Sequence, residues 1–231
     1  MSGLVTFECE GSVGTVTFRR PEVGNQVNLA TMRALIDALE QAGDSDADVL
    51  VLRGEGETFC VGRDQDEEPE DLSFRENLSL ILTANELWRD FDGVTVAAVS
   101  GDALGFGCGL ALQADVTIAA EDAQLGFTEI HHGFAPTIVL TYIETFLPRK
   151  RALDLVMTGR TVPAEEAREM GMVTRVAPSE GFEGAVDSFV DTLAGLNADA
   201  LRTCKFYMRE IGDVPPEERG EYALDTLTGG D

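Results

Sequence analysis

Residues 95–112 read TVAAVSGDALGFGCGLAL and join a buried strand, a glycine-rich turn and the start of a helix. Residues 95–99, which are apolar except for Thr95, are typical of a buried strand. The first amides of the following helix have no internal partner, its dipole favours negative charge, and glycine lets a ligand approach closely. The turn at residues 105–109 is therefore a candidate site for an oxyanion that develops on a carbonyl. Close packing of the helix on the sheet explains its glycines equally well.

The segments before this stretch alternate between strand and helix patterns. Residues 13–18 alternate apolar with small or polar side chains, as a half-buried strand does. Apolar residues recur at helical spacing from Leu29 to Leu39, and Asn28 is a candidate N-cap. Further elements are predicted as a buried strand at 49–52, a solvated loop at 65–73, a helix at about 74–90 and a strand at 116–119.

The second half of the chain has a mostly helical pattern from Ala135 onward. Pro163 and Gly171 frame a short helix that has two glutamates in its first turn. Residues 172–176 are predicted to form a last strand. Because no linker divides the sequence and helices follow the strand–helix alternation, we expect an α/β fold in one domain, residues 1–231.

Charge is the strongest signal in the composition. The chain has 42 acidic residues against 17 basic ones, and its formal net charge is -25. Such a surface repels nucleic acid and anionic membranes, so we expect neither as a partner. The acidic, lysine-poor composition resembles that of proteins from salt-loving cytoplasms, which predicts a halophile. No apolar run is long enough to span a bilayer and the first residues lack a signal-peptide pattern, so a cytoplasmic location is expected.

The four cysteines, Cys9, Cys60, Cys108 and Cys204, stand far apart in a chain that has two histidines. This spacing argues against a zinc site or a disulfide framework. We expect the cysteines to be small buried hydrophobic residues and no metal to be bound.

Six further signals occur in an order that resembles the enoyl-CoA hydratase/isomerase (crotonase-like) superfamily, and the resemblance covers residues 13–212. The segments that carry it are Arg20-Pro21 with residues 25–28, Phe59–Asp64, Ala97–Leu112, Asp115–Ala120, Gly126–Ile130, and Thr158–Arg160 with residues 164–167 and 171–173. The resemblance implies a spiral of repeated ββα units over about residues 1–190. It also implies a C-terminal helical region, about 191–231, that assembles a homotrimer or a dimer of trimers.

The resemblance also implies a site for an acyl-CoA substrate, with no separate cofactor. Matched by position, the backbone amides of Arg63 and Phe106 hold the thioester oxygen, and Glu129 is the acid/base. Both amide positions usually carry small residues in the family, so the ring of Phe106 is expected to narrow or reshape the acyl pocket. The remaining residues expected to contact substrate or CoA are Gln26, Val27, Val61, Gly62, Asp64, Leu104, Gly105, Gly107, Gly109, Thr128, His131, His132 and Gly133.

One departure from the family pattern bears on the reaction. Hydratases of the family use two glutamates, and the first of them aligns with Gly109, which has no side chain. A single carboxylate at Glu129 favours isomerase-like proton transfer. Hydration with a substituted partner, a non-catalytic acyl-CoA-binding subunit, and hydrolase, decarboxylase or lyase chemistry remain as alternatives. His131 and His132 are candidate partners, or they serve polar packing.

Two further side chains have alternative interpretations. The guanidinium of Arg63 contacts a CoA phosphate or a substrate carboxylate, or else it faces solvent or pairs with Asp64 or Asp66. Lys205 is similar to a lysine in the family's late helix, and a helix cap or a salt bridge between subunits explains it equally well.

Overall fold

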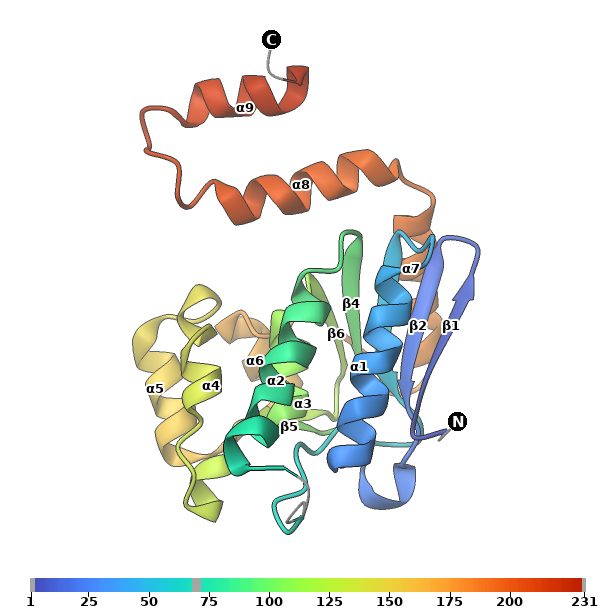
Figure 1. Ribbon diagram of the computed structural model, residues 1–231, viewed down its shortest axis with the longest axis vertical. Coiled ribbons are helices and arrows are strands. Elements are labelled where there is room, and N and C mark those ends of the chain that lie inside the picture. The colour runs from blue at the N-terminus through green and yellow to red at the C-terminus, as the bar shows by residue number, and fades with distance from the viewer. Residues whose placement is uncertain (1–2, 68–71, 230–231) are drawn as a thin grey trace.

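The structure is a computed structural model that describes residues 3–67 and 72–229 (Figure 1). Within these residues the main sheet has six strands in the order β1-β2-β3-β4-β6-β9. β1 pairs antiparallel with β2, and the other neighbours are parallel. The strand bounds are β1 (Val5–Glu10), β2 (Val13–Phe18), β3 (Val49–Gly54), β4 (Val94–Val99), β6 (Val116–Ala120) and β9 (Arg175–Ala177). The predicted α/β class is confirmed.

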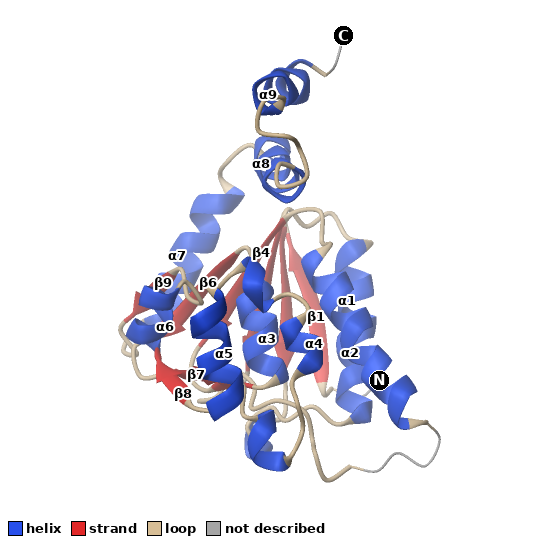
Figure 2. Ribbon diagram, turned by 90° about the vertical axis from the view of Figure 1, so that its left-hand side faces the viewer, coloured by secondary structure: helices blue, strands red, loops and turns tan. Residues whose placement is uncertain are grey.

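Helices cover both faces of this sheet (Figure 2). Val49 and Val51 of β3 pack in a cluster with residues of α7 (Phe182–Ala194). Leu50 and Leu52 point to the opposite face, where α1 (Leu29–Gly43), α2 (Phe74–Arg89) and α3 (Phe106–Gln113) lie. Successive side chains of a strand point to opposite faces, so a strand covered on both faces is apolar at every position.

The starts of α1 and α2 follow from local sequence. The side chain of Asn28 accepts a hydrogen bond from the backbone N–H of Thr31, as predicted for an N-cap. Ser73 and Glu76 form a reciprocal capping box at the start of α2. The predicted helix at 74–90 is thereby confirmed. Of the predicted loop at 65–73, residues 68–71 lie outside the described residues.

A second, smaller sheet was not predicted from the sequence. Apart from the helix framed by Pro163 and Gly171, the short helices after Ala135 were predicted only as a mostly helical pattern. The small sheet has the order β5-β7-β8, formed by β5 (Ala103–Leu104), β7 (Gln124–Gly126) and β8 (Thr161–Pro163). The predicted strand at 172–176 was shifted, since β9 begins at Arg175. The remaining helices are η1 (Pro21–Val23), η2 (Glu129–His132), α4 (Thr137–Leu140), η3 (Ile143–Thr145), α5 (Arg149–Thr158) and α6 (Ala164–Met170). Pro163 and Gly171 flank α6 as predicted.

α8 (Ala198–Glu210) and α9 (Arg219–Thr228) lie beyond one end of the main sheet (Figure 1). Lys205 fastens α8 to the body, because its Nζ lies 2.8 Å from Asp115 Oδ2 and donates to the carbonyls of Phe91 and Gly93. The two helices leave large apolar side chains exposed, namely Phe206, Met208, Leu224 and Leu227. The division into one core and a helical assembly region stays a prediction.

Two expectations on composition can now be assessed. Cys60 and Cys108 are buried as predicted, whereas the prediction was wrong for Cys9 and Cys204, which are exposed. Cys9 lies near the end of the edge strand β1 and Cys204 on the exposed helix α8, and neither element is covered there. Among the described residues, no helix combines the length and apolar character needed to cross a bilayer.

Candidate active site

Two loops that follow strands of the main sheet are joined by main-chain hydrogen bonds. Cys60 N–H donates to the carbonyl of Asp102, and Leu104 N–H donates to the carbonyl of Cys60. On the other side of the same loop, Val27 N–H donates to the carbonyl of Gly62 at 2.8 Å. The loop at residues 60–63 is therefore fixed between the segment before α1 and the segment before α3.

Glycine permits the close approach of these loops. Gly62 has φ +98°, and a Cβ there would lie 3.0 Å from the carbonyl oxygen of Leu104. A Cβ at Gly107 would lie 2.2 Å from the carbonyl oxygen of Cys60, too close for any side chain. Gly107 thus serves close packing, the alternative that the sequence left open. Gly105, with φ +51°, instead faces the carboxylate of Glu129, whose Oε1 would lie 3.4 Å from its Cβ.

The amides after the two positive-φ glycines are available to a ligand. Within the described residues, the backbone N–H groups of Arg63 and Phe106 donate to no protein acceptor. Phe106 opens α3, where the first amides have no partner within the helix. The amide of Phe106 would lie 3.5 Å from a Cβ at Gly62, so the two loops present their donors side by side.

Glu129 carries an unsatisfied carboxylate beside these amides. Its Oε2 is buried and has no hydrogen-bond partner among the described residues. Burial raises the pKa of Glu129, whereas a hydrogen bond from its own backbone and the charge of His132 lower that pKa by smaller amounts. A carboxyl group with a raised pKa and a free oxygen is suited to accept and return a proton.

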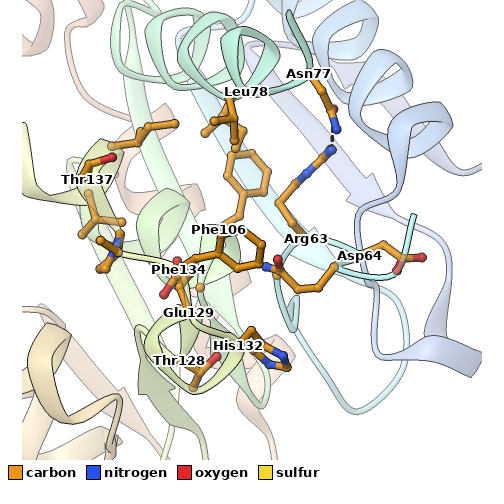
Figure 3. Close-up of a pocket in the computed structure, with 18 of the residues that line it drawn as sticks. Arg63, Asp64, Asn77, Leu78, Phe106, Thr128, Glu129, His132, Phe134 and Thr137 are labelled. Atoms are coloured by element: carbon orange, nitrogen blue, oxygen red, sulfur yellow. Dashed lines mark hydrogen bonds between the residues drawn. The ribbon is translucent and has the colours of Figure 1, made fainter. Parts of the chain in front are cut away.

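These groups border a pocket of about 500 Å³ (Figure 3). The predicted site residues that line it are Val61, Gly62, Arg63, Asp64, Gly105, Phe106, Thr128, Glu129 and His132. The predicted residues outside its described lining are Gln26, Val27, Leu104, Gly107, Gly109, His131 and Gly133. Val27, Leu104 and Gly107 fix the loops behind the lining. Sequence reasoning missed the contribution of α2 and of residues 134–139, which supply most of the apolar lining.

The two histidines turn in different directions. The Nε2 of His131 lies 3.0 Å from the carbonyl oxygen of Gly159 at the end of α5, away from the pocket. His132 lines the pocket close enough to Glu129 for its charge to lower the pKa of that carboxyl. Adjacency in sequence could not separate their positions.

Tyr142, which sequence reasoning did not name, occupies the space beside Gly109. A Cβ on Gly109 would lie 2.5 Å from the Tyr142 hydroxyl oxygen, so this phenol stands where a longer side chain at Gly109 would project. Burial raises the pKa of Tyr142 above its ordinary value, and the neighbouring carboxyl group of Glu129 acts in the same direction. The phenol therefore stays protonated. The missing side chain of Gly109 was the available signal, but it could not identify the residue that fills the gap.

Arg63 and Phe106 direct their side chains toward α2 (Figure 3). The ring of Phe106 lies near Leu78, and Arg63 Nη2 donates to Asn77 Oδ1 at 2.7 Å. Phe106 thus forms part of the pocket wall, and a cavity of about 500 Å³ remains beside it. The interpretation that Arg63 faces solvent or pairs with Asp64 or Asp66 was wrong. The guanidinium contacts Asn77 instead.

Comparison with known proteins gives one consistent result. The family model for enoyl-CoA hydratase/isomerase matches residues 8–223. A protein of Rhizobium meliloti, named a probable enoyl-CoA hydratase, is 38% identical over 86% of this chain and 78% of its own length. The 2,3-dehydroadipyl-CoA hydratase of Escherichia coli is 34% identical over 86% of this chain and 79% of its own. A Thermobifida fusca protein, assigned as an enoyl-CoA hydratase and solved in complex with CoA, superposes with a TM-score of 0.86 at 27% identity, covering 98% of this chain and 92% of that one.

Proposed function

Because the chain belongs to the enoyl-CoA hydratase/isomerase family, we propose that it converts an acyl-CoA thioester through an enolate, with Glu129 as its acid/base. The CoA bound to the Thermobifida fusca relative supports this substrate class. The observation that carries the proposal is the buried Oε2 of Glu129 beside the amides of Arg63 and Phe106, none of which has a hydrogen-bond partner among the described residues. The CoA thioester is itself the substrate, and no further cofactor enters the proposal.

The proposed chemistry divides between main chain and side chain. The amides of Arg63 and Phe106 donate to the thioester oxygen, which gains negative charge as the enolate forms. Preorganised donors of this kind contribute most where water is excluded, and losing one costs about 10²–10³ in rate. Glu129, as the carboxylate, removes a proton from the carbon skeleton and returns it to another carbon, so no atom is gained or lost.

Isomerisation of a 3-enoyl-CoA to a 2-enoyl-CoA fits a single central carboxylate best. Two other acidic residues of the described lining are already engaged, since Glu67 accepts from the backbone N–H of Leu29 and Asp64 accepts from that of Asp66. Neither replaces the glutamate that is missing at Gly109. The proposed enzyme therefore moves one proton with one group.

A second candidate function, hydration of a 2-enoyl-CoA, is favoured by the position of Tyr142. Its protonated phenol beside Gly109 is able to hold a water molecule by accepting a hydrogen bond from it. Glu129 would then take one proton of that water as the water oxygen bonds to C3, and it would return this proton to C2 of the enolate. In this case Tyr142→Phe lowers hydration by about 100-fold and leaves isomerisation nearly unchanged.

The test follows crotonyl-CoA and a 3-enoyl-CoA separately, in molar potassium chloride. Turnover of the 3-enoyl substrate alone, abolished in Glu129→Gln, is the expected result. Hydration of crotonyl-CoA that is lost in Tyr142→Phe would establish the second candidate. A Glu129→Gln enzyme that keeps full turnover of either substrate would refute the assignment of Glu129.

Assembly and environment complete the proposal. A homotrimer or a dimer of trimers accounts for the apolar side chains that α8 and α9 leave exposed. The net charge of -25 repels an anionic thioester unless salt screens it, which fits a halophilic cytoplasm. Sedimentation at several salt concentrations tests both points.

A further inference from the structure

The guanidinium of Arg63 lies against α2, one side-chain length away from the backbone amide of the same residue. Its backbone amide belongs to the loop after β3, while its side chain runs toward α2 and reaches Asn77 (Figure 3). One residue therefore contributes two donors beside the same cavity, an amide at one end of its own length and a guanidinium at the other. Loop residues with small side chains would leave the second end apolar.

This guanidinium has a donor without a partner. Arg63 Nη1 is buried and finds no acceptor among the described residues, while Nη2 is held by the neutral amide of Asn77. Arg53 and Arg202 also each have a buried nitrogen, Nε, without a hydrogen-bond partner among the described residues, but both pair with carboxylates, Arg53 with Glu183 and Arg202 with Asp48. Arg63 is half-buried, and like Arg20 it has no carboxylate in direct contact among the described residues, although the chain carries 42 acidic residues.

Within residues 3–67 and 72–229, no protein acceptor satisfies Arg63 Nη1. The neighbouring lining from α2 and from residues 134–139 is largely apolar, including Phe74, Leu78 and Phe134. Burial lowers the pKa of Arg63, and the nearby charges of Glu67 and Asp64 raise it, but an arginine stays protonated in either case. A buried cation with a spare donor is costly unless an anion meets it.

We propose that the acyl group of the substrate carries a carboxylate at its far end, which binds Arg63 Nη1. The inference rests on the proposed function, since it places the thioester oxygen at the amide of the same residue. The two ends are separated by one arginine side chain, which corresponds to an acyl chain on the order of six carbons. The substrate class is therefore a short dicarboxylic acyl-CoA. A CoA phosphate is the other anion of the same ligand that could bind Arg63, and the experiment below distinguishes it from the carboxylate.

The experiment measures binding by calorimetry in molar potassium chloride, which needs no turnover. Adipyl-CoA and hexanoyl-CoA have equal chain length and differ in the terminal carboxylate, and free CoA reports on the phosphates. Wild type should bind adipyl-CoA about tenfold or more tightly than hexanoyl-CoA, the range for a charge-assisted hydrogen bond. Arg63→Met should remove this preference, with free CoA unaffected.

Asn77→Asp is the matched second variant, because it keeps Arg63 and supplies a carboxylate from the protein itself. It should also abolish the preference for adipyl-CoA while hexanoyl-CoA still binds. Circular dichroism checks that both variants fold, and Arg63→Lys, which keeps a positive charge, should retain part of the preference.

Each other outcome has a distinct meaning. Equal binding of the two thioesters by wild type, or a preference that survives Arg63→Met, overturns the carboxylate assignment and leaves the proposed function intact. If Arg63→Met binds free CoA more weakly by the same factor as the thioesters, the guanidinium contacts a CoA phosphate. That result also overturns the carboxylate assignment. If wild type binds neither the thioesters nor CoA, the proposed function itself fails.

Discussion

The two walls of the pocket are built in different ways. The loop wall, residues 60–63 and 103–107, is held by main-chain hydrogen bonds and by glycines at the contacts. The helix wall, residues 74–81 of α2 with residues 134–142, presents side chains from segments far apart in the sequence. The loop wall offers backbone amides whatever its side chains are, whereas every substitution in the helix wall changes the shape or charge of the cavity. Substitutions should therefore act differently on the two sides.

The largest effect is expected in the loop wall, from Gly107→Ala. The added Cβ would lie 2.2 Å from the carbonyl oxygen of Cys60, so two backbone segments must separate. We expect the free energy of unfolding to fall by about 3 kcal/mol in denaturant titrations. Gly184→Ala in α7 is the control, because nothing lies within 4 Å of its Cβ position. Equal stability of the two variants would show that the loops are not closely packed.

A smaller effect on chain length is expected from Phe106→Ala at the point where the walls meet. The amide of Phe106 is kept, so turnover of a short acyl-CoA should change only a few-fold. Removing the ring enlarges the cavity, and each buried methylene contributes about 0.8 kcal/mol. Lengthening the acyl chain by two carbons should therefore raise kcat/KM about tenfold more in the variant than in wild type. Identical chain-length profiles would exclude the ring from the wall.

Glu129, which stands between the walls, should make stability depend on pH. Because burial raises its pKa in the folded state, the folded protein binds the proton more tightly than the unfolded chain does. Stability is then lost as pH rises from the ordinary carboxyl range through the raised pKa. Glu129→Gln should be more stable than wild type above that range and equal to it below. Urea titrations across pH measure this difference in the free energy of unfolding, and the exposed Glu217→Gln is the control. A difference between Glu129→Gln and wild type that stays constant with pH would contradict the prediction.

The smallest effect is expected from the histidines. A positive charge on His132 lowers the pKa of Glu129, so His132→Gln should move the acid limb of kcat/KM to higher pH. His131→Gln is the matched control, because Nε2 of His131 faces the carbonyl of Gly159 instead. Equal shifts of the acid limb in both variants would mean that the effect does not depend on whether the imidazole faces the pocket.

The same contrast explains how far sequence reasoning reached. Asn28, Ser73 and the apolar run of β3 act locally, so α1, α2 and the central strands were predictable. β5, β7 and β8 are two or three residues long and exist through pairing with distant segments, which periodicity does not report. In the site, a family resemblance pointed to Glu129 and to two amides. Asn77 and Tyr142 come from elements whose approach is decided by tertiary packing, so they were missed.

In the proposed function, Arg63 and Phe106 would each have two roles, because the amide would bind the thioester oxygen while the side chain shapes the acyl pocket. A point mutation at either codon therefore alters which compound is selected and leaves the reactive apparatus in place. After gene duplication, one copy is able to change its preferred metabolite by single steps, each of which yields a working catalyst. In this scaffold new specificities arise without passing through inactive ancestors.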